Sequence, residues 1–181
     1  MAILVQTTAS GRERQEVGAE HPLFVQVKQT PESGTSVPVT SHIFPSELVE
    51  IPGIGTAVAY ATAEAFGTRF PIVVPVEGTI AQVTFLDFDD EGINKELVLF
   101  SREFTATADN AAFNPSDADL NFCLGVISID TWYNYSANQV GVATPAFHYV
   151  APSGTIYGQF VTRGADNIAA GSIPKFFVVV I

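Results

Sequence analysis

Short apolar runs separated by turn-forming residues make up most of the sequence from residue 57 onward. In GTIAQVTFLDF (78–88), Ala81, Val83 and Phe85 fall on one face of an extended chain, and polar residues lie between them. A period of two is the pattern of a β-strand with one buried face. Gly, Pro, Asn and Asp interrupt the runs, which is typical of a sandwich or barrel of short strands. The sequence therefore predicts an all-β domain.

One of these runs predicts an inner strand. In ELVLFSREF (96–104), Val98 and Phe100 alternate with Leu97 and Leu99, so both faces begin apolar and only later divide, as in an inner strand that is covered at one end. Further strands are expected at residues 57–63, 70–76, 122–129, 147–150, 155–163 and 175–181.

Together with a strand near Phe24, these runs predict a jelly-roll-like β-sandwich of about eight strands. We place the sandwich domain at residues 56–181. One short helix is expected at SDADLNF (116–122), because Ser116 can cap it and Asp119 follows three positions later.

The first part of the chain, residues 1–55, differs from the rest and contains one convincing strand, LFVQVKQT (23–30). Proline has no backbone N–H and disfavours a helix in the residue before it. The segment is therefore expected to be an extended N-terminal arm or a strand-exchange segment, and long loops folded onto the domain are the alternative. Phe24, Val25 and Val27 are candidate interface residues. The prolines recur at Pro22, Pro31, Pro38, Pro45 and Pro52.

Composition and charge favour a protein partner. Hydrophobic residues form 47% of the chain and charged residues only 15%, so apolar surface remains for a subunit interface after a core has formed. A formal net charge of −11 disfavours binding to nucleic acid. No run approaches the roughly 20 apolar residues of a membrane helix. The N-terminal MAILVQTTASGRER lacks the pattern of a secretory signal, so we expect synthesis in a cytoplasm and no membrane partner.

The strongest candidate for a metal site is DFDDEG (87–92), where Asp87, Asp89 and Glu91 alternate and Gly92 follows. This matches the first half of a calcium loop. The twelfth position should be a bidentate Glu, but here it is Val98. We therefore expect a polar turn between two strands, with no bound metal.

A second oxygen-rich cluster consists of Asp109, Asn110, Asp117 and Asp119. Such residues can bind a hard cation or act as the acid and base of glycoside hydrolysis. In loops, however, Asn and Asp more often cap backbone groups, and NPSD fits that role.

The remaining reactive side chains are isolated in the sequence. His21, His42 and His148 form no metal-binding motif, and Cys123, the single cysteine, has no evident base nearby. With no motif for a nucleophile or a nucleotide either, we expect no enzymatic activity, no catalytic residue and no cofactor.

Two groups of side chains are candidates for an interface. Trp132, Tyr133 and Tyr135 in TWYNYS can stack on a sugar ring or on a partner, although packing at the rim of the core is the ordinary role of such residues. Arg69 and Arg163 are notable in a chain with few basic residues, and each can pair with an acidic loop or with another subunit.

Three segments carry a family resemblance: FGTRF (66–70), ELVLFSREFTATADNAAFNPSDADLNFCLGVISI (96–129) and YGQFVTRG (157–164). The chain resembles the head decoration, or cement, proteins of tailed bacteriophages over about residues 57–164. The resemblance implies a capsid-binding β domain, usually clustered as trimers at local threefold positions of the outer shell. It implies no catalytic residues.

The sequence thus favours a structural virion protein that binds the outer surface of a tailed-phage capsid and stabilises contacts between capsomers. The expected partners are the major capsid protein and the chain itself, as a homotrimer. The first alternative is a tail-associated or carbohydrate-binding module for host attachment, with TWYNYS as its contact surface. The second is a metal-dependent glycan hydrolase that uses Asp109 and Asp117.

Overall fold

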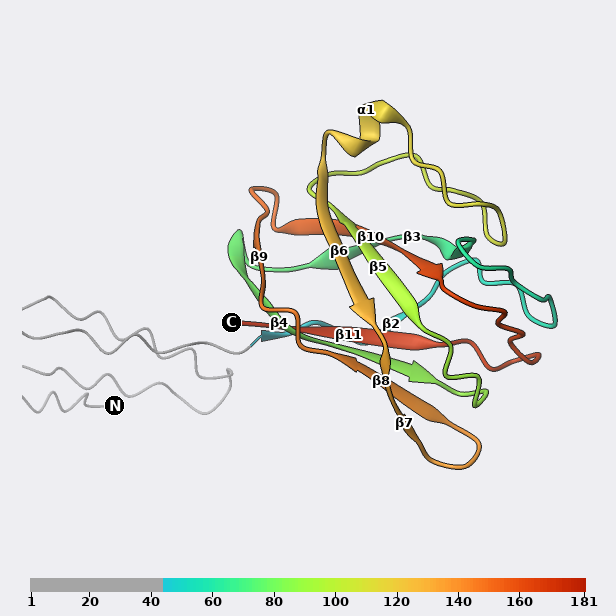
Figure 1. The fold of residues 1–181 in the computed structure, drawn as a ribbon. Helices are drawn as coiled ribbons and strands as arrows, with labels where there is room; N and C mark the ends of the chain where they lie inside the picture. Colours follow the sequence, from blue (N-terminus) through green and yellow to red (C-terminus); the bar gives the residue numbers. More distant parts are fainter. Residues whose placement is uncertain (1–43) are drawn as a thin grey trace, which may run out of the picture. The chain divides into compact units, whose positions relative to one another are not determined.

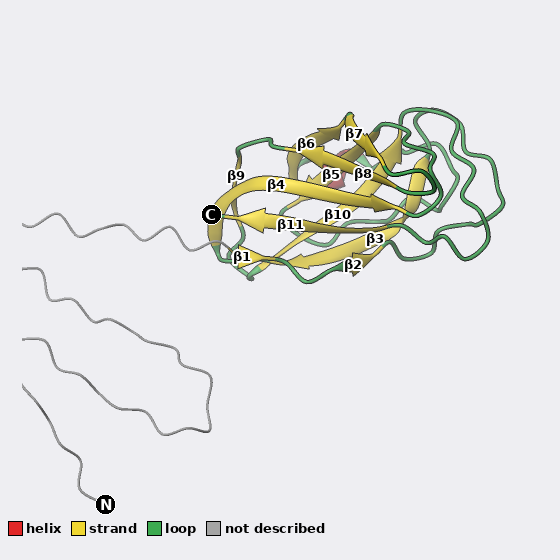
Figure 2. Ribbon diagram, turned by 90° about the horizontal axis from the view of Figure 1, so that it is seen from below, coloured by secondary structure: helices red, strands yellow, loops and turns green. Residues whose placement is uncertain are grey.

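Two antiparallel β-sheets face each other in residues 44–181, the part of the chain that this computed structural model describes (Figure 1, Figure 2). The first sheet contains β1 (Phe44–Pro45), β2 (Val49–Glu50), β4 (Glu77–Asp87), β7 (Thr131–Asn134), β8 (Gln139–Ala143), β9 (Phe147–Val150) and β11 (Lys175–Val180). The second sheet contains β3 (Ala65–Val73), β5 (Lys95–Phe100), β6 (Cys123–Ile129) and β10 (Thr155–Thr162).

The strand order makes β4 the centre of the first sheet. The order is β1-β11-β4-β8-β7, with β2 also pairing with β11 and β9 with β4. One side of β4 pairs with β11, while β8 and β9 share its other side. In the second sheet the order is β3-β10-β5-β6, so β5 and β10 are the inner strands.

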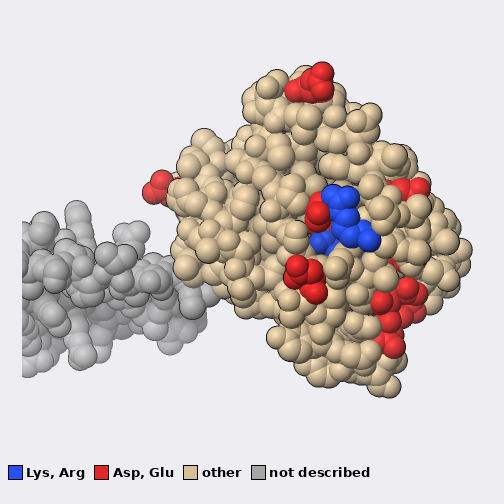
Figure 3. Space-filling view, in the orientation of Figure 1, with Lys and Arg blue, Asp and Glu red and all other residues tan. Residues whose placement is uncertain are grey.

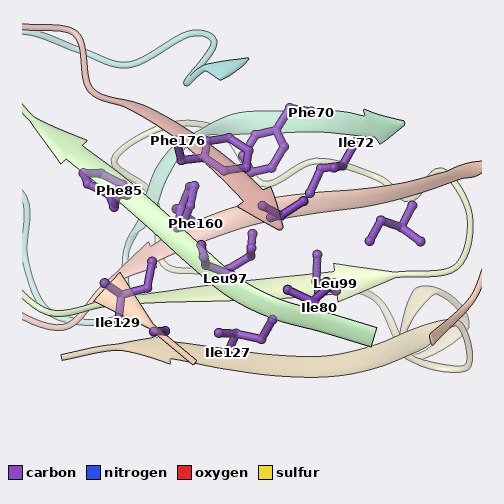
Figure 4. Close-up of a cluster of buried hydrophobic side chains, with 14 of the residues drawn as sticks. Phe70, Ile72, Ile80, Phe85, Leu97, Leu99, Ile127, Ile129, Phe160 and Phe176 are labelled. Carbon is purple, nitrogen blue, oxygen red and sulfur yellow. The ribbon is translucent and has the colours of Figure 1, made fainter. Parts of the chain in front are cut away.

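Aromatic rings join the two sheets at the centre of the sandwich (Figure 4). The ring centroid of Phe160, on β10, lies 5.5 Å from that of Phe70, 5.2 Å from that of Phe85 and 5.0 Å from that of Phe176. Phe85 and Phe176 belong to the first sheet, and all four side chains are at most 1% exposed. Burying a side chain of this size contributes about 1.5 to 3 kcal/mol, so this cluster is a main source of sandwich stability.

The two apolar faces of β5 contact different clusters. Leu97 and Leu99 belong to the core between the sheets. Val98 and Phe100 lie on the opposite face, where they pack with Phe104 under the segment that follows β5. The prediction of an inner strand is confirmed, because β5 lies between β10 and β6.

The all-β sandwich is also confirmed, and the one helix within residues 44–181 is α1 (Asp117–Leu120). Ser116 caps this helix, because its hydroxyl accepts a hydrogen bond from the Asp119 N–H at 3.1 Å. The expected strand at 57–63 is wrong. Ala57 and Ala63 have φ values of 58° and 68°, which interrupt an extended chain, and this segment forms only an isolated bridge through Ala59.

The last residues of the expected arm contact the sandwich. β1 and β2 pair with β11, and Ile51 is 1% exposed in the core. The candidate interface residues Phe24, Val25 and Val27 lie outside the described residues. The finer jelly-roll assignment stays a prediction.

Candidate functional site

The aromatic side chains of TWYNYS (131–136) divide between the core and the surface. Trp132 packs edge-on against Phe85, with ring centroids 5.8 Å apart, and its Nε1 donates a hydrogen bond to Asn94 at 3.1 Å. Tyr133 and Tyr135 are 52% and 64% exposed. The structure therefore separates Trp132 from the two tyrosines, which are the residues available to a ligand or partner.

The two candidate arginines both form hydrogen bonds within the domain. Arg69, on β3, donates to the Glu103 carboxylate and to the Phe104 carbonyl. Arg163 donates to Glu96, and this hydrogen bond raises the pKa of Arg163. On the face in Figure 3, basic side chains form one small cluster next to acidic ones, and most of the remaining surface is uncharged. Both arginines thus stabilise contacts between neighbouring elements of the domain.

The acidic loop that resembles half a calcium site is a turn held by its own backbone. Asp87 is 3% exposed, and its carboxylate accepts hydrogen bonds from the N–H groups of Asp89 and Gly92, both at 2.9 Å. These bonds fold the backbone of the turn around the Asp87 carboxylate. The arrangement is the polar turn expected from the sequence.

Asp109 has a similar structural role in the second acidic cluster. Its carboxylate accepts hydrogen bonds from the Gly55 N–H at 2.8 Å, the Gly67 N–H at 2.6 Å and the Tyr60 hydroxyl at 2.9 Å. Burial, together with the nearby Asp109 carboxylate, raises the pKa of Tyr60. Asp109 therefore connects Gly55 and Tyr60, in the segment before β3, to Gly67 in β3 through hydrogen bonds.

Apolar side chains are exposed at the end of the sandwich that holds the β3–β4 connection. Val73, Val76 and Val150 are 78%, 59% and 51% exposed, and the Ala151 N–H donates to the Val76 carbonyl at 2.6 Å. The C-terminus and the start of β1 lie at this same end (Figure 1, Figure 2). A groove of about 600 Å³ opens beside these residues, lined by Pro45, Ser46, Glu47, Val49, Pro71, Ile72, Val73, Val74 and Pro75. We call this surface the apolar end.

A buried ion pair lies where β5 begins and β10 ends. Lys95 Nζ is 2.8 Å from Asp166 Oδ1, and the two side chains are 2% and 0% exposed. Lys95 Nζ also donates to the Ile93 carbonyl at 2.7 Å. Thr162, which pairs with Lys95 in the sheet, has its hydroxyl in hydrogen-bond contact with Asp166 Oδ2.

Aromatic rings surround this pair. Lys95 Nζ lies 4.8 Å from the ring centroid of Phe66, 5.7 Å from that of Phe85 and 5.6 Å from that of Trp132. Burial lowers the pKa of Lys95 and raises that of Asp166, while the attraction between the two groups opposes both shifts. The surroundings therefore favour the neutral forms of an amine and a carboxylic acid.

Sequence reasoning missed this pair because its members are 71 positions apart. One signal was available: Lys95 begins β5, which the sequence predicts as an inner strand, and a charged side chain there is costly unless it has a partner. The partner itself depends on the pairing of β5 with β10, which no local pattern specifies.

The other isolated reactive residues remain separate in the structure. Cys123 is half-buried and His148 is exposed. Among residues 44–181, no group of three or more His, Cys, Asp or Glu side chains is placed to hold a metal ion. In the same range, no helix has the length and apolar character needed to cross a membrane.

Comparison with known proteins identifies no relative. No family model, no curated protein and no solved structure matches the chain. The function must therefore be argued from the residues and surfaces described above.

Proposed function

We propose that this protein is a decoration protein, a structural component of the virion that binds the outer surface of a tailed-phage capsid and stabilises contacts between capsomers. Its partners would be the major capsid protein and two further copies of itself. It acts by binding and carries out no catalysis. The resemblance of residues 96–129 and 157–164 to such proteins supports the proposal.

The observation that carries the proposal is the apolar end. Exposed valines beside an apolar groove form a surface suited to a protein partner, since exposed apolar patches mark interaction sites. Prolines border the groove, and Pro71 in particular lacks an N–H for further strand pairing. This surface would contact the shell through side chains.

Cosedimentation of the purified chain with capsids that lack a decoration protein tests the proposal. Val73→Asp and Val76→Asp each place a charge on the apolar end, and we expect each to weaken capsid binding by at least about tenfold. Val126→Asp is the matched control, because Val126 is 49% exposed on β6, away from the apolar end. Wild-type protein that does not bind capsids would refute the proposal, as would equal binding by all variants.

The oligomeric state provides a second test. Light scattering on the full chain should give the mass of three chains of 19.3 kDa each, either alone or after release from capsids. A monomer in both states would contradict the trimer, while leaving capsid binding to be judged by cosedimentation.

A second candidate function is host attachment through a glycan, and it is favoured by the exposed rings of Tyr133 and Tyr135. Saturable binding to a glycan array, lost in Tyr133→Ala and Tyr135→Ala, would support it. Trp132→Ala is a poor test, because Trp132 packs on Phe85 and its loss would disturb the core.

A further inference from the structure

The fold holds Lys95 Nζ and the Asp166 carboxyl group within reach of each other. A nitrogen 2.8 Å from one carboxyl oxygen lies roughly 3 to 4 Å from the carboxyl carbon, depending on the angle at the oxygen, and this range includes the separation of a near-attack arrangement. The Ile93 carbonyl holds the amine on its other side. Both side chains are nearly or fully buried, so the arrangement is fixed by the fold and does not depend on chance contact at the surface.

The surroundings of Lys95 and Asp166 favour formation of an amide over an ion pair. An amine attacks a carboxyl group only when the amine is neutral. Burial lowers the pKa of Lys95 and raises the pKa of Asp166, and both shifts favour the neutral form of the group. The rings of Phe66, Phe85 and Trp132 exclude water from the amine. Low access of water disfavours the reverse reaction, hydrolysis of an amide.

Thr162 adds a hydrogen bond to the carboxyl group. Its hydroxyl contacts Asp166 Oδ2 and also lies 3.2 Å from the Gly164 carbonyl. A hydroxyl has a single hydrogen. Donated to Asp166 Oδ2, this hydrogen lowers the pKa of Asp166 and so partly opposes the effect of burial, while it holds the carboxyl group in place beside Lys95 Nζ.

We propose that Lys95 and Asp166 form an intramolecular isopeptide bond, an amide cross-link between the start of β5 and the loop that follows β10. Lys95 Nζ attacks Asp166 Cγ, a C–N bond forms, and the C–O bond to one carboxyl oxygen breaks. That oxygen leaves as water, made from the hydroxyl group of the protonated carboxyl and one hydrogen of the neutral amine, so an amine and a carboxylic acid become one amide and one water. No oxidant, cofactor or second protein is needed.

The mass of the intact, denatured full chain tests this inference directly on the wild-type protein. We expect the mass to be lower than that of the linear sequence by about 18 Da, one water. Proteolysis should then yield a branched peptide in which Lys95 is joined to Asp166. A wild-type chain that keeps its full linear mass after prolonged incubation in the folded state would overturn the proposal.

Three variants distinguish formation of the cross-link from other reactions that release water. Lys95→Arg and Asp166→Ala should keep their full masses, because neither can form the amide. Lys175→Arg is the matched control: Lys175 forms an exposed pair with Glu50 at 3.5 Å, so its replacement should leave the loss of water intact. A loss of water that persists in Lys95→Arg would show that a succinimide forms instead, and would also overturn the proposal.

Discussion

Removing Asp166 alone is expected to destabilise the domain strongly. Asp166→Ala leaves Lys95 buried among aromatic rings without its carboxylate. Breaking a buried ion pair by removing one partner costs about 3 to 5 kcal/mol. The proposed amide would add to this loss, because a link across a loop of roughly 70 residues contributes about 4 kcal/mol in the chain-entropy treatment of cross-links.

Urea unfolding, followed by the fluorescence of the single tryptophan, measures the effect. The free energy of unfolding of Asp166→Ala should fall by at least about 3 kcal/mol. The double variant Lys95→Met/Asp166→Leu removes both charges and keeps the volume filled, so it should be more stable than Asp166→Ala. If the amide is present in the wild type, the double variant should still unfold about 4 kcal/mol more easily than the wild type.

A surface pair provides the control for this experiment. Lys175 and Glu50 are 3.5 Å apart, and their side chains are 36% and 56% exposed. Lys175→Met should therefore cost no more than about 1 kcal/mol. If Asp166→Ala costs as little as this control, the reasoning about the buried pair is wrong.

The core and the backbone give three further predictions. Phe160→Ala removes the ring that joins both sheets and should cost about 3 to 5 kcal/mol in thermal unfolding. Tyr149→Phe removes a buried hydroxyl that has no hydrogen-bond partner among residues 44–181, and should stabilise the domain by about 1 kcal/mol. Burial raises the pKa of Tyr149 to about 12, so the Tyr149 hydroxyl loses its proton at a lower pH in the unfolded state than in the folded state. The free energy of unfolding of the wild type should therefore fall as the pH rises from 10 to 12. Over the same range the stability advantage of Tyr149→Phe should grow. Gly67→Ala should lower the free energy of unfolding in urea by about 1 to 3 kcal/mol, because Gly67 has a φ of 73° and an added Cβ would overlap Ile51. Gly171→Ala is the control and should cost less, because Gly171 has a φ of 87° but no neighbour within 4 Å of an added Cβ.

The parts of the fold that the sequence predicted are those where local pattern and burial agree. The long alternating run became β4, and the doubly apolar run became the inner strand β5. The run AVAYATA (57–63) also looks like a strand, but the segment bends so that Tyr60 can reach Asp109, 49 positions away. A contact that distant overrides a local pattern.

Four strands were not predicted. β1 and β2 lie in the segment expected to be an arm, and β7 and β8 are short and contain Asn or Gly, so TWYNYS was interpreted as a contact surface or as packing at the rim of the core. Gly141 in β8 has a purpose that only the fold reveals: a Cβ there would lie 2.8 Å from Ile129 and 3.0 Å from the ring of Trp132. The close approach of Trp132 to the core therefore requires a glycine at this position, although glycine weakens the interior of a strand.

The two proposals concern opposite ends of one strand and can be tested independently. β10 begins at Thr155, which pairs with Val73 at the apolar end, and finishes at Thr162, which pairs with Lys95. Seven steps along a strand span about 23 Å, and substitutions separated by more than about 10 Å usually act additively. Val73→Asp should therefore weaken capsid binding and leave the loss of water unchanged, while Lys95→Arg should abolish that loss and, once folded, bind capsids as the wild type does. If either single variant lost both capsid binding and the loss of water, the two ends would be coupled through β10. We do not expect this coupling, because the Phe160 cluster packs the two sheets together between the two ends.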